Sequence, residues 1–124
     1  MIAKYFNNLE GLLEGHYHIV EDYILNKQIF TQEKGTIDGE VFFIDESQLD
    51  FLEVVNTNKQ AKSKYRYHYM DKSNEMIFRY DNAKHHPRIK TFPHHKHIMT
   101  RAVEGCNEPG IEEVLFEIGK HISA

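Results

Sequence analysis

Histidine and arginine residues gather in one segment of the chain, residues 79–97, which reads RYDNAKHHPRIKTFPHHKH. Five of the nine histidines lie in this segment: His85, His86, His94, His95 and His97. An imidazole changes its charge near neutral pH, so it can accept a proton, donate one or, when neutral, bind a metal ion. We therefore expect the chemistry of this protein to take place around this segment.

One interpretation of the segment is phosphoester chemistry on RNA. Histidines would act as base and acid, taking a proton from the 2′-hydroxyl and returning one to the leaving oxygen, with no metal or other cofactor. Cationic side chains of the segment could hold the phosphate: Arg79, Arg88, Lys90 and Lys96. Two aromatic side chains, Tyr80 and Phe92, could stack on an unpaired base.

Two other interpretations remain open. The histidines could coordinate a metal ion with an oxygen from Asp81, although the spacing His94-His95-x-His97 is not typical of known metal sites. Alternatively, a proline-bracketed loop could wrap the edge of a sheet, with its imidazoles bonded to backbone groups that irregular structure leaves free.

The residues that precede the segment predict a β-hairpin, with strands at 64–70 and 75–81 and a turn at 71–74. Because side chains alternate across a strand, the tyrosines of the first strand share one face, while Arg66 and His68 point to the other. With a four-residue turn, Arg66 would lie opposite Arg79, and Tyr67 opposite Phe78. Two like charges in that position call for an anion between them.

Glu53 is the candidate for that anion. It interrupts an apolar strand predicted at 49–55 and shares its parity with Leu49 and Phe51. In one register it lies beside Arg66 and completes a row, Glu53–Arg66–Arg79. Such a row could be a surface ion-pair ladder that contributes little stability. It could equally be a face that binds phosphate, since arginine matches phosphate oxygens with two hydrogen bonds.

The remaining pattern places helices at both ends of the chain. Apolar residues at helical spacing predict a helix at 3–13, and a second at 111–121 follows Pro109 and Gly110. Residues 19–30 are ambiguous between helix and strand, and we expect a strand; residues 37–44 predict another. Residues 82–110 show little periodicity. We expect an α+β fold: an antiparallel meander sheet of four to five strands, both terminal helices packed on one face, and a long irregular segment rich in histidine and proline.

Length and composition narrow the class of protein. The 124 residues fit a single domain, 1–124, and the net charge of -4 argues against a histone-like nucleic-acid binder. Cys106 is the only cysteine, which suits a reducing compartment. No signal peptide or apolar run of membrane-spanning length is visible. We expect a soluble cytoplasmic protein without a membrane partner.

The segment 79–97 resembles the hallmark of the TumE-like family, which is described as the toxin half of type II toxin–antitoxin pairs. The resemblance extends upstream through YRYHYMDKSNEMIFRYDNA and LDFLEVV and downstream to IEEVLFEI. One departure is Lys84, where the family often has proline. The positions that the resemblance marks are Glu53, Arg66, His68, Arg79, Asp81, Asn82, His85, His86, Pro87, Thr91, Phe92, Pro93, His94, His95 and His97.

The resemblance implies a growth-inhibiting toxin with a cognate antitoxin protein as its partner. RNA is the further partner that the residues suggest, and a second copy of the chain is another candidate. In the enzymatic hypothesis, Glu53 or His68 is the general base, one of the five segment histidines is the acid, and Arg66 and Arg79 hold the phosphate. Asp81 and Asn82 would join the nucleic-acid-binding set. The alternative is a module that binds nucleic acid or protein without catalysis.

Overall fold

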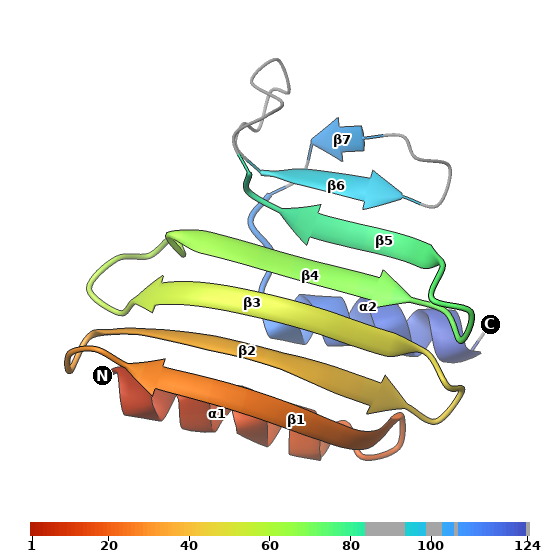
Figure 1. The fold of residues 1–124 in the computed structure, drawn as a ribbon, viewed down its shortest axis with the longest axis horizontal. Helices are drawn as coiled ribbons and strands as arrows, with labels where there is room; N and C mark the ends of the chain where they lie inside the picture. Colours follow the sequence, from red (N-terminus) through yellow and green to blue (C-terminus); the bar gives the residue numbers. More distant parts are fainter. Residues whose placement is uncertain (84–93, 99–102, 106, 124) are drawn as a thin grey trace.

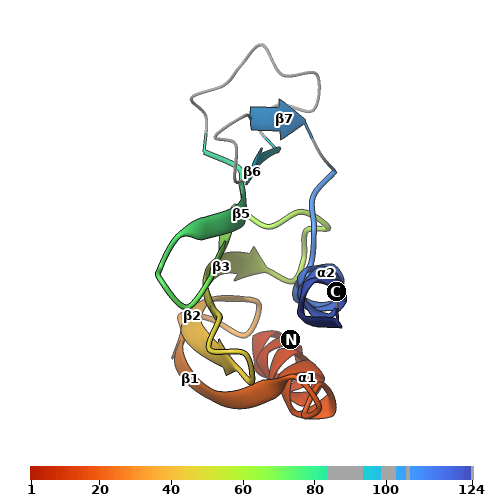
Figure 2. The same ribbon diagram turned by 90° about the vertical axis from the view of Figure 1, so that its right-hand side faces the viewer.

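A computed structural model describes residues 1–83, 94–98, 103–105 and 107–123. Its described part is a single antiparallel sheet with two helices on one face (Figures 1 and 2). In chain order the elements are α1 (Ile2–Gly15), β1 (Val20–Ile29), β2 (Lys34–Phe43), β3 (Gln48–Asn56), β4 (Lys64–Met70), β5 (Met76–Asp81), β6 (His95–Ile98), β7 (Val103–Gly105) and α2 (Ile111–Ser123).

The sheet contains more strands than the sequence predicts. Its described strands number seven, in the order β1-β2-β3-β4-β5-β6-β7, and each pairs antiparallel with its neighbours. The five expected strands are β1 to β5, and the ambiguous stretch 19–30 contains strand β1, as expected. The prediction of four to five strands is wrong because β6 and β7 lie inside 82–110. Strands of four and three residues are too short to show an alternating pattern.

The hydrophobic core lies between the sheet and the two helices. On β4 the side chains of Tyr65, Tyr67 and Tyr69 are at most 1% exposed, and they point toward this core as the alternation predicts. Both helices lie on the same side of the sheet (Figure 2). They contribute core side chains at helical spacing: Phe6, Leu9 and Leu13 from α1, and Val114, Leu115 and Ile118 from α2. We call this side the helix face and the other side the open face.

Helix α2 begins where the sequence predicts. Pro109 and Gly110 precede it, and the carboxylate of Glu113 accepts a hydrogen bond from the Gly110 backbone N–H at 3.1 Å. Acidic residues occupy its first turn and basic residues its last, which complements the helix dipole. Within the described part of the chain, no helix is long and apolar enough to cross a membrane.

Candidate functional site

The register between β4 and β5 decides which charged side chains meet. His68 pairs with Arg79, and Arg66 pairs with Asp81. The predicted pairing of Arg66 with Arg79 is therefore wrong by two residues. The cause is the connection between the strands: the register shifts between Tyr69 and Met70, and Met70 pairs with Met76. A pair of like charges is replaced by a pair of opposite charges, which is favourable across neighbouring strands.

The turn itself explains the longer connection. The Asp71 carboxylate accepts hydrogen bonds from the backbone N–H groups of Ser73, at 2.8 Å, and Glu75, at 3.0 Å. Asn74 adopts a positive φ of 64°, a conformation that asparagine tolerates better than most residues. The turn thus extends over 71–75 rather than the expected 71–74. The Asp-Lys-Ser-Asn composition signals a turn but does not specify its length.

Three of the predicted site side chains form a row across neighbouring strands of the open face. His68 on β4 pairs with Arg79 on β5, which pairs in turn with His97 on β6. Neighbouring strands lie about 4.8 Å apart, so the two histidines flank the arginine at similar spacing. The next row along the strands contains Arg66, Asp81 and the backbone of His95. The structure therefore brings together two arginines and two histidines that the sequence singled out.

Asp81 links members of the two rows. Its side chain is only 2% exposed, and its Oδ2 atom lies 3.1 Å from Nε of Arg79 and 3.3 Å from Nε2 of His97. The other carboxylate oxygen accepts a hydrogen bond from the Ala83 backbone N–H at 3.1 Å. This carboxylate is thus within ion-pair distance of the Arg79 guanidinium and of the His97 imidazole. The sequence predicted a nucleic-acid contact for Asp81, and this stays a prediction; the contacts of its side chain described here are with Arg79, His97 and the Ala83 backbone.

His68 occupies an environment that favours the neutral imidazole. Burial lowers the pKa of His68 from its ordinary value of 6.5, and the positive charges of Arg79 and Arg66 lower it further, while Asp50 opposes them. The Nδ1 atom of His68 is buried and has no hydrogen-bond partner within the described residues. A neutral imidazole next to a guanidinium can accept a proton.

Glu53 does not belong to this row. It pairs with Tyr65, and its side chain is completely buried on the helix face. The hydroxyl of Tyr5 donates to Oε1 of Glu53 at 2.5 Å, and the hydroxyl of Tyr67 donates to Oε2. The predicted row Glu53–Arg66–Arg79 is therefore wrong. Glu53 does share one side of its strand with Leu49 and Phe51, as predicted. That side faces the helices, whereas the side chain of Arg66 points to the open face.

Tyr80 and Lys96 also lie on the helix face. The Tyr80 hydroxyl donates to Glu117 of α2 at 2.6 Å, and the Lys96 ammonium donates to the same carboxylate at 2.9 Å. Lys96 also lies 5.0 Å from the centre of the Tyr80 ring, a cation–π contact. Burial and the hydrogen bond to Glu117 raise the pKa of Tyr80 to about 12. These two predicted nucleic-acid contacts attach β5 and β6 to α2, and they do not share a face with Arg79.

Two further predicted site residues contact the backbone or side chain of Tyr65. Asn82 accepts a hydrogen bond from the Tyr65 backbone N–H at 3.0 Å and donates to the Ser63 carbonyl at 3.3 Å. The Nδ1 atom of His94 lies 2.8 Å from the Tyr65 hydroxyl, and the two rings stack. The side chain of His95 lies outside the described part of the structure. The same holds for the other predicted site residues, which are His85, His86, Arg88, Lys90 and Phe92.

Acidic side chains border the row on the open face, a feature that the sequence reading missed. Asp50 pairs with His68 on one side and with Glu40 on the other. A hollow of about 280 Å³ is lined by Asp38, Glu40, Asp50 and Arg66. Alternation along β2 could have predicted this, because Asp38 and Glu40 share one parity there. Among the described residues, no group of three or more histidine, cysteine, aspartate or glutamate side chains is placed to hold a metal ion.

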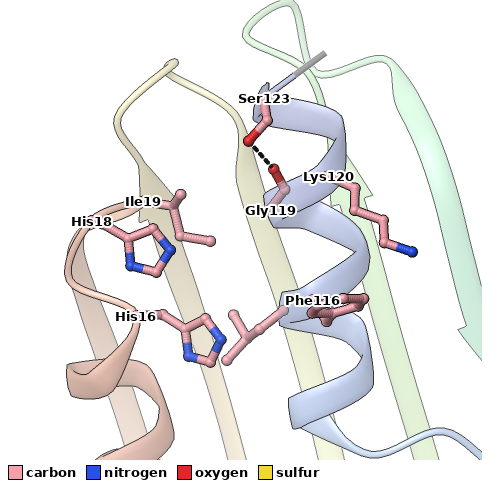
Figure 3. A pocket seen from close by; sticks show the side chains of 8 residues that line it. His16, His18, Ile19, Phe116, Gly119, Lys120 and Ser123 are labelled. Carbon is pink, nitrogen blue, oxygen red and sulfur yellow. Dashed lines mark hydrogen bonds between the residues drawn. The ribbon is translucent and has the colours of Figure 1, made fainter.

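A larger hollow of about 580 Å³ lies on the other side of the molecule, between the α1–β1 turn and α2 (Figure 3). Its apolar lining includes Ile19, Leu115 and Phe116, and the stacked rings of His16 and His18 stand at its rim. Nδ1 of His16 donates to the Leu12 carbonyl at 2.7 Å. This hollow is remote from the row on the open face and contains none of the predicted site residues.

The fold and the row of side chains define a class: a small α+β protein with arginine and histidine side chains gathered on the uncovered face of its sheet. Residues 9–123 match the family model described as Toxin TumE. The chain therefore belongs to the TumE toxin family, as the motif at 79–97 indicated, and its role is that of a toxin. No curated protein and no solved structure matches it.

Proposed function

We propose that this toxin cleaves RNA without a metal ion, at the row formed by His68, Arg79 and His97. The observation that carries the proposal is the order of these side chains. A cation stands between two imidazoles on adjacent strands, and a phosphate bound to that cation would have one imidazole on either side. Acid–base cleavage of RNA requires a base on one side of the phosphate and an acid on the other.

The roles follow from the surroundings of each side chain. His68, whose pKa is lowered, accepts the proton of the 2′-hydroxyl, and the freed oxygen attacks the adjacent phosphorus. His97, paired with Asp81, donates its proton to the 5′-oxygen as the bond from that oxygen to phosphorus breaks. The products are a 2′,3′-cyclic phosphate and a 5′-hydroxyl end. Arg79 and Arg66 neutralise the negative charge that develops on the phosphate oxygens.

Glu53, the other candidate base, is excluded from this scheme because it is buried among tyrosines on the helix face. The acidic hollow beside His68 would limit the length of RNA that the open face can bind. Asp38, Glu40 and Asp50 would repel a phosphate backbone that crossed toward β2, so the RNA would lie over β4 to β6. We further propose that a cognate antitoxin protein is the partner that restrains the toxin.

The test is to incubate the purified protein with single-stranded RNA in the presence of EDTA, beside the Arg79→Ala variant. We expect the wild type to cleave the RNA and the variant to lose at least about a hundredfold in rate, a typical loss for a group that stabilises transition-state charge. Lys34→Ala, at an exposed lysine of β2 far from the row, is the matched control and should cleave normally. Intact RNA with both proteins would refute the proposal, and RNA bound but uncut would favour a binding module.

A further inference from the structure

Strand β1 forms one edge of the sheet and is ten residues long. It pairs with β2 alone among the described strands, and it contains neither proline nor glycine (Figure 1). The backbone N–H of Tyr23 donates to the carboxylate of Asp22 at 2.8 Å, and the N–H of Phe30 donates to the Lys34 carbonyl of β2 at 2.9 Å. Because hydrogen bonds alternate along an antiparallel pair, these contacts indicate that the odd-numbered residues of β1 turn their backbone groups outward. A long edge of this kind can accept another strand.

The exposed apolar side chains of the described chain concentrate along this edge. Seven large apolar side chains are more than half exposed, and three of them, Ile24, Ile29 and Phe30, lie on β1 or directly after it. Tyr17 lies in the turn that precedes β1, and Ile44 donates its backbone N–H to the Ile19 carbonyl beside that turn.

Met1 lies at the opposite end of the strand, because its neighbour Ile2 bonds to Gln32 in the hairpin turn that follows β1. Only Phe116 of the seven lies elsewhere, on α2. Six of the seven thus lie along this edge strand or beside its ends, and exposed apolar side chains gathered in this way typically mark an interface.

We infer that two copies of this chain pair antiparallel through β1, about a two-fold axis that passes beside Ile24. This register places Ile24 against Ile24 of the second copy on the open face. It also brings the end of β1 that follows Tyr17 to the partner's end with Ile29 and Phe30, so the exposed apolar side chains at the two ends cover each other. An isologous interface requires this self-complementarity.

The charges along the strand are compatible with the same register. Glu21 lies near one end of β1 and Lys27 near the other, so each would approach the oppositely charged residue of the second copy. Lys27 also bonds Glu10 of its own chain at 2.6 Å, which holds its ammonium group beside this edge. Pairing through β1 would join the two sheets into one, with the rows of His68 and Arg79 of both copies on the same open face.

The first test measures molar mass by light scattering during size-exclusion chromatography, from micromolar to millimolar protein. We expect the wild type to elute at twice the chain mass of 14.7 kDa, and Ile24→Lys to elute at the chain mass, because two ammonium groups would meet at the axis. Phe116→Lys replaces the exposed apolar residue away from the edge and should remain a dimer. A wild type that stays at 14.7 kDa throughout would overturn the inference.

A disulfide tests the register itself. In a Cys106→Ser background, Ile24→Cys should form an intermolecular disulfide on mild oxidation, because directly opposed residues of this type have Cα atoms about 4.5 Å apart. Asn26→Cys should not, since the two copies of that residue would lie about 13 Å apart along the strands. A dimer that withstands Ile24→Lys, or that cross-links as readily at residue 26 as at residue 24, would show that β1 is not the interface.

Discussion

Nε2 of His97 lies 3.3 Å from Oδ2 of Asp81, and the same oxygen lies 3.1 Å from Nε of Arg79. One buried carboxylate thus orients two of the three side chains in the row. This arrangement gives the imidazole of His97 a defined direction. A side chain held in place before the substrate arrives loses less freedom when it binds.

Asp81→Asn is expected to slow RNA cleavage by about tenfold or more while leaving RNA binding nearly unchanged. The amide keeps the shape of the side chain but removes the negative charge that stabilises protonated His97. Steady-state kinetics would show the loss in kcat rather than in KM. Asp38→Asn, in the acidic hollow but not among the charges that shift the pKa of His68, is the control and should not reduce kcat. An equal loss in both variants would contradict a specific role for Asp81.

Stability should fall on acidification in a way that depends on His68. Its pKa in the folded protein lies below the ordinary value of 6.5, so the unfolded chain binds the proton more readily. The contribution of His68 is therefore present above pH 6.5 and is lost as the pH falls from there toward the folded pKa. Urea midpoints at several pH values should show a shallower decline for His68→Gln than for the wild type. The same decline in both proteins would contradict this contribution of His68.

Glu53→Leu should destabilise the fold by about 2–4 kcal/mol, because the hydroxyls of the half-buried Tyr5 and the buried Tyr67 would both lose their acceptor. Glu53→Gln keeps an acceptor and should cost less. Denaturant unfolding measures both. Since Glu53 lies on the helix face, folded Glu53→Gln should cleave RNA at the wild-type rate. A loss of cleavage by a stable Glu53→Gln would restore Glu53 as a candidate base.

Alkaline pH should weaken the attachment of β5 to α2. The pKa of Tyr80 is raised from 10.0 to about 12 in the folded protein, so the unfolded chain loses this proton first. The stabilising contribution of the protonated phenol is complete below pH 10 and is lost as the pH rises toward 12. Tyr80→Phe should show a smaller decline of the unfolding free energy over this range. An identical decline would mean that other groups control the alkaline transition.

Two glycines should respond to alanine in opposite directions. A Cβ at Gly39 would lie 2.6 Å from the Ile24 carbonyl oxygen and 3.0 Å from the Phe51 ring, so Gly39→Ala should destabilise β1 and β2, by about 1–3 kcal/mol. A Cβ at Gly11 meets nothing within 4 Å, and the residue is exposed in α1. Gly11→Ala should therefore stabilise by about 0.5–1 kcal/mol. Thermal or urea unfolding of the two variants tests both signs.

The sequence was sufficient to predict the helices and strands whose apolar residues recur with a clear period. The alternating tyrosines of β4 predicted both the buried face and the opposite face with Arg66 and His68, and both helices occur at the expected places. The register of the hairpin was not predictable, because it depends on a local shift beside Met70 and on the side-chain hydrogen bonds of Asp71. Composition identifies a turn but not the number of residues in it.

The sequence predicted which types of residue form the candidate site, but it predicted only partly which of these residues lie together. The motif at 79–97 correctly drew attention to Arg79, Asp81 and His97, which meet. It could not show that Lys96 faces α2, since β6 was not recognised as a strand and the parity of its residues was therefore unknown. Tyr80 differs, because alternation along the predicted strand 75–81 already places it on the face opposite Arg79. Likewise, the carboxylate of Glu53 looks like a surface charge until two tyrosine hydroxyls from α1 and β4 are seen to bind it.

The central claim is that His68 and His97 act on opposite sides of a phosphate held by Arg79. The most direct measurement compares cleavage, in EDTA, of a single-stranded RNA with cleavage of the same strand carrying 2′-deoxyribose at the cut positions. We predict fragments with 2′,3′-cyclic phosphate and 5′-hydroxyl ends from the RNA, none from the substituted strand, and none from RNA treated with His68→Ala or His97→Ala. Equal cleavage of both strands, or undiminished cleavage by either histidine variant, would contradict the account.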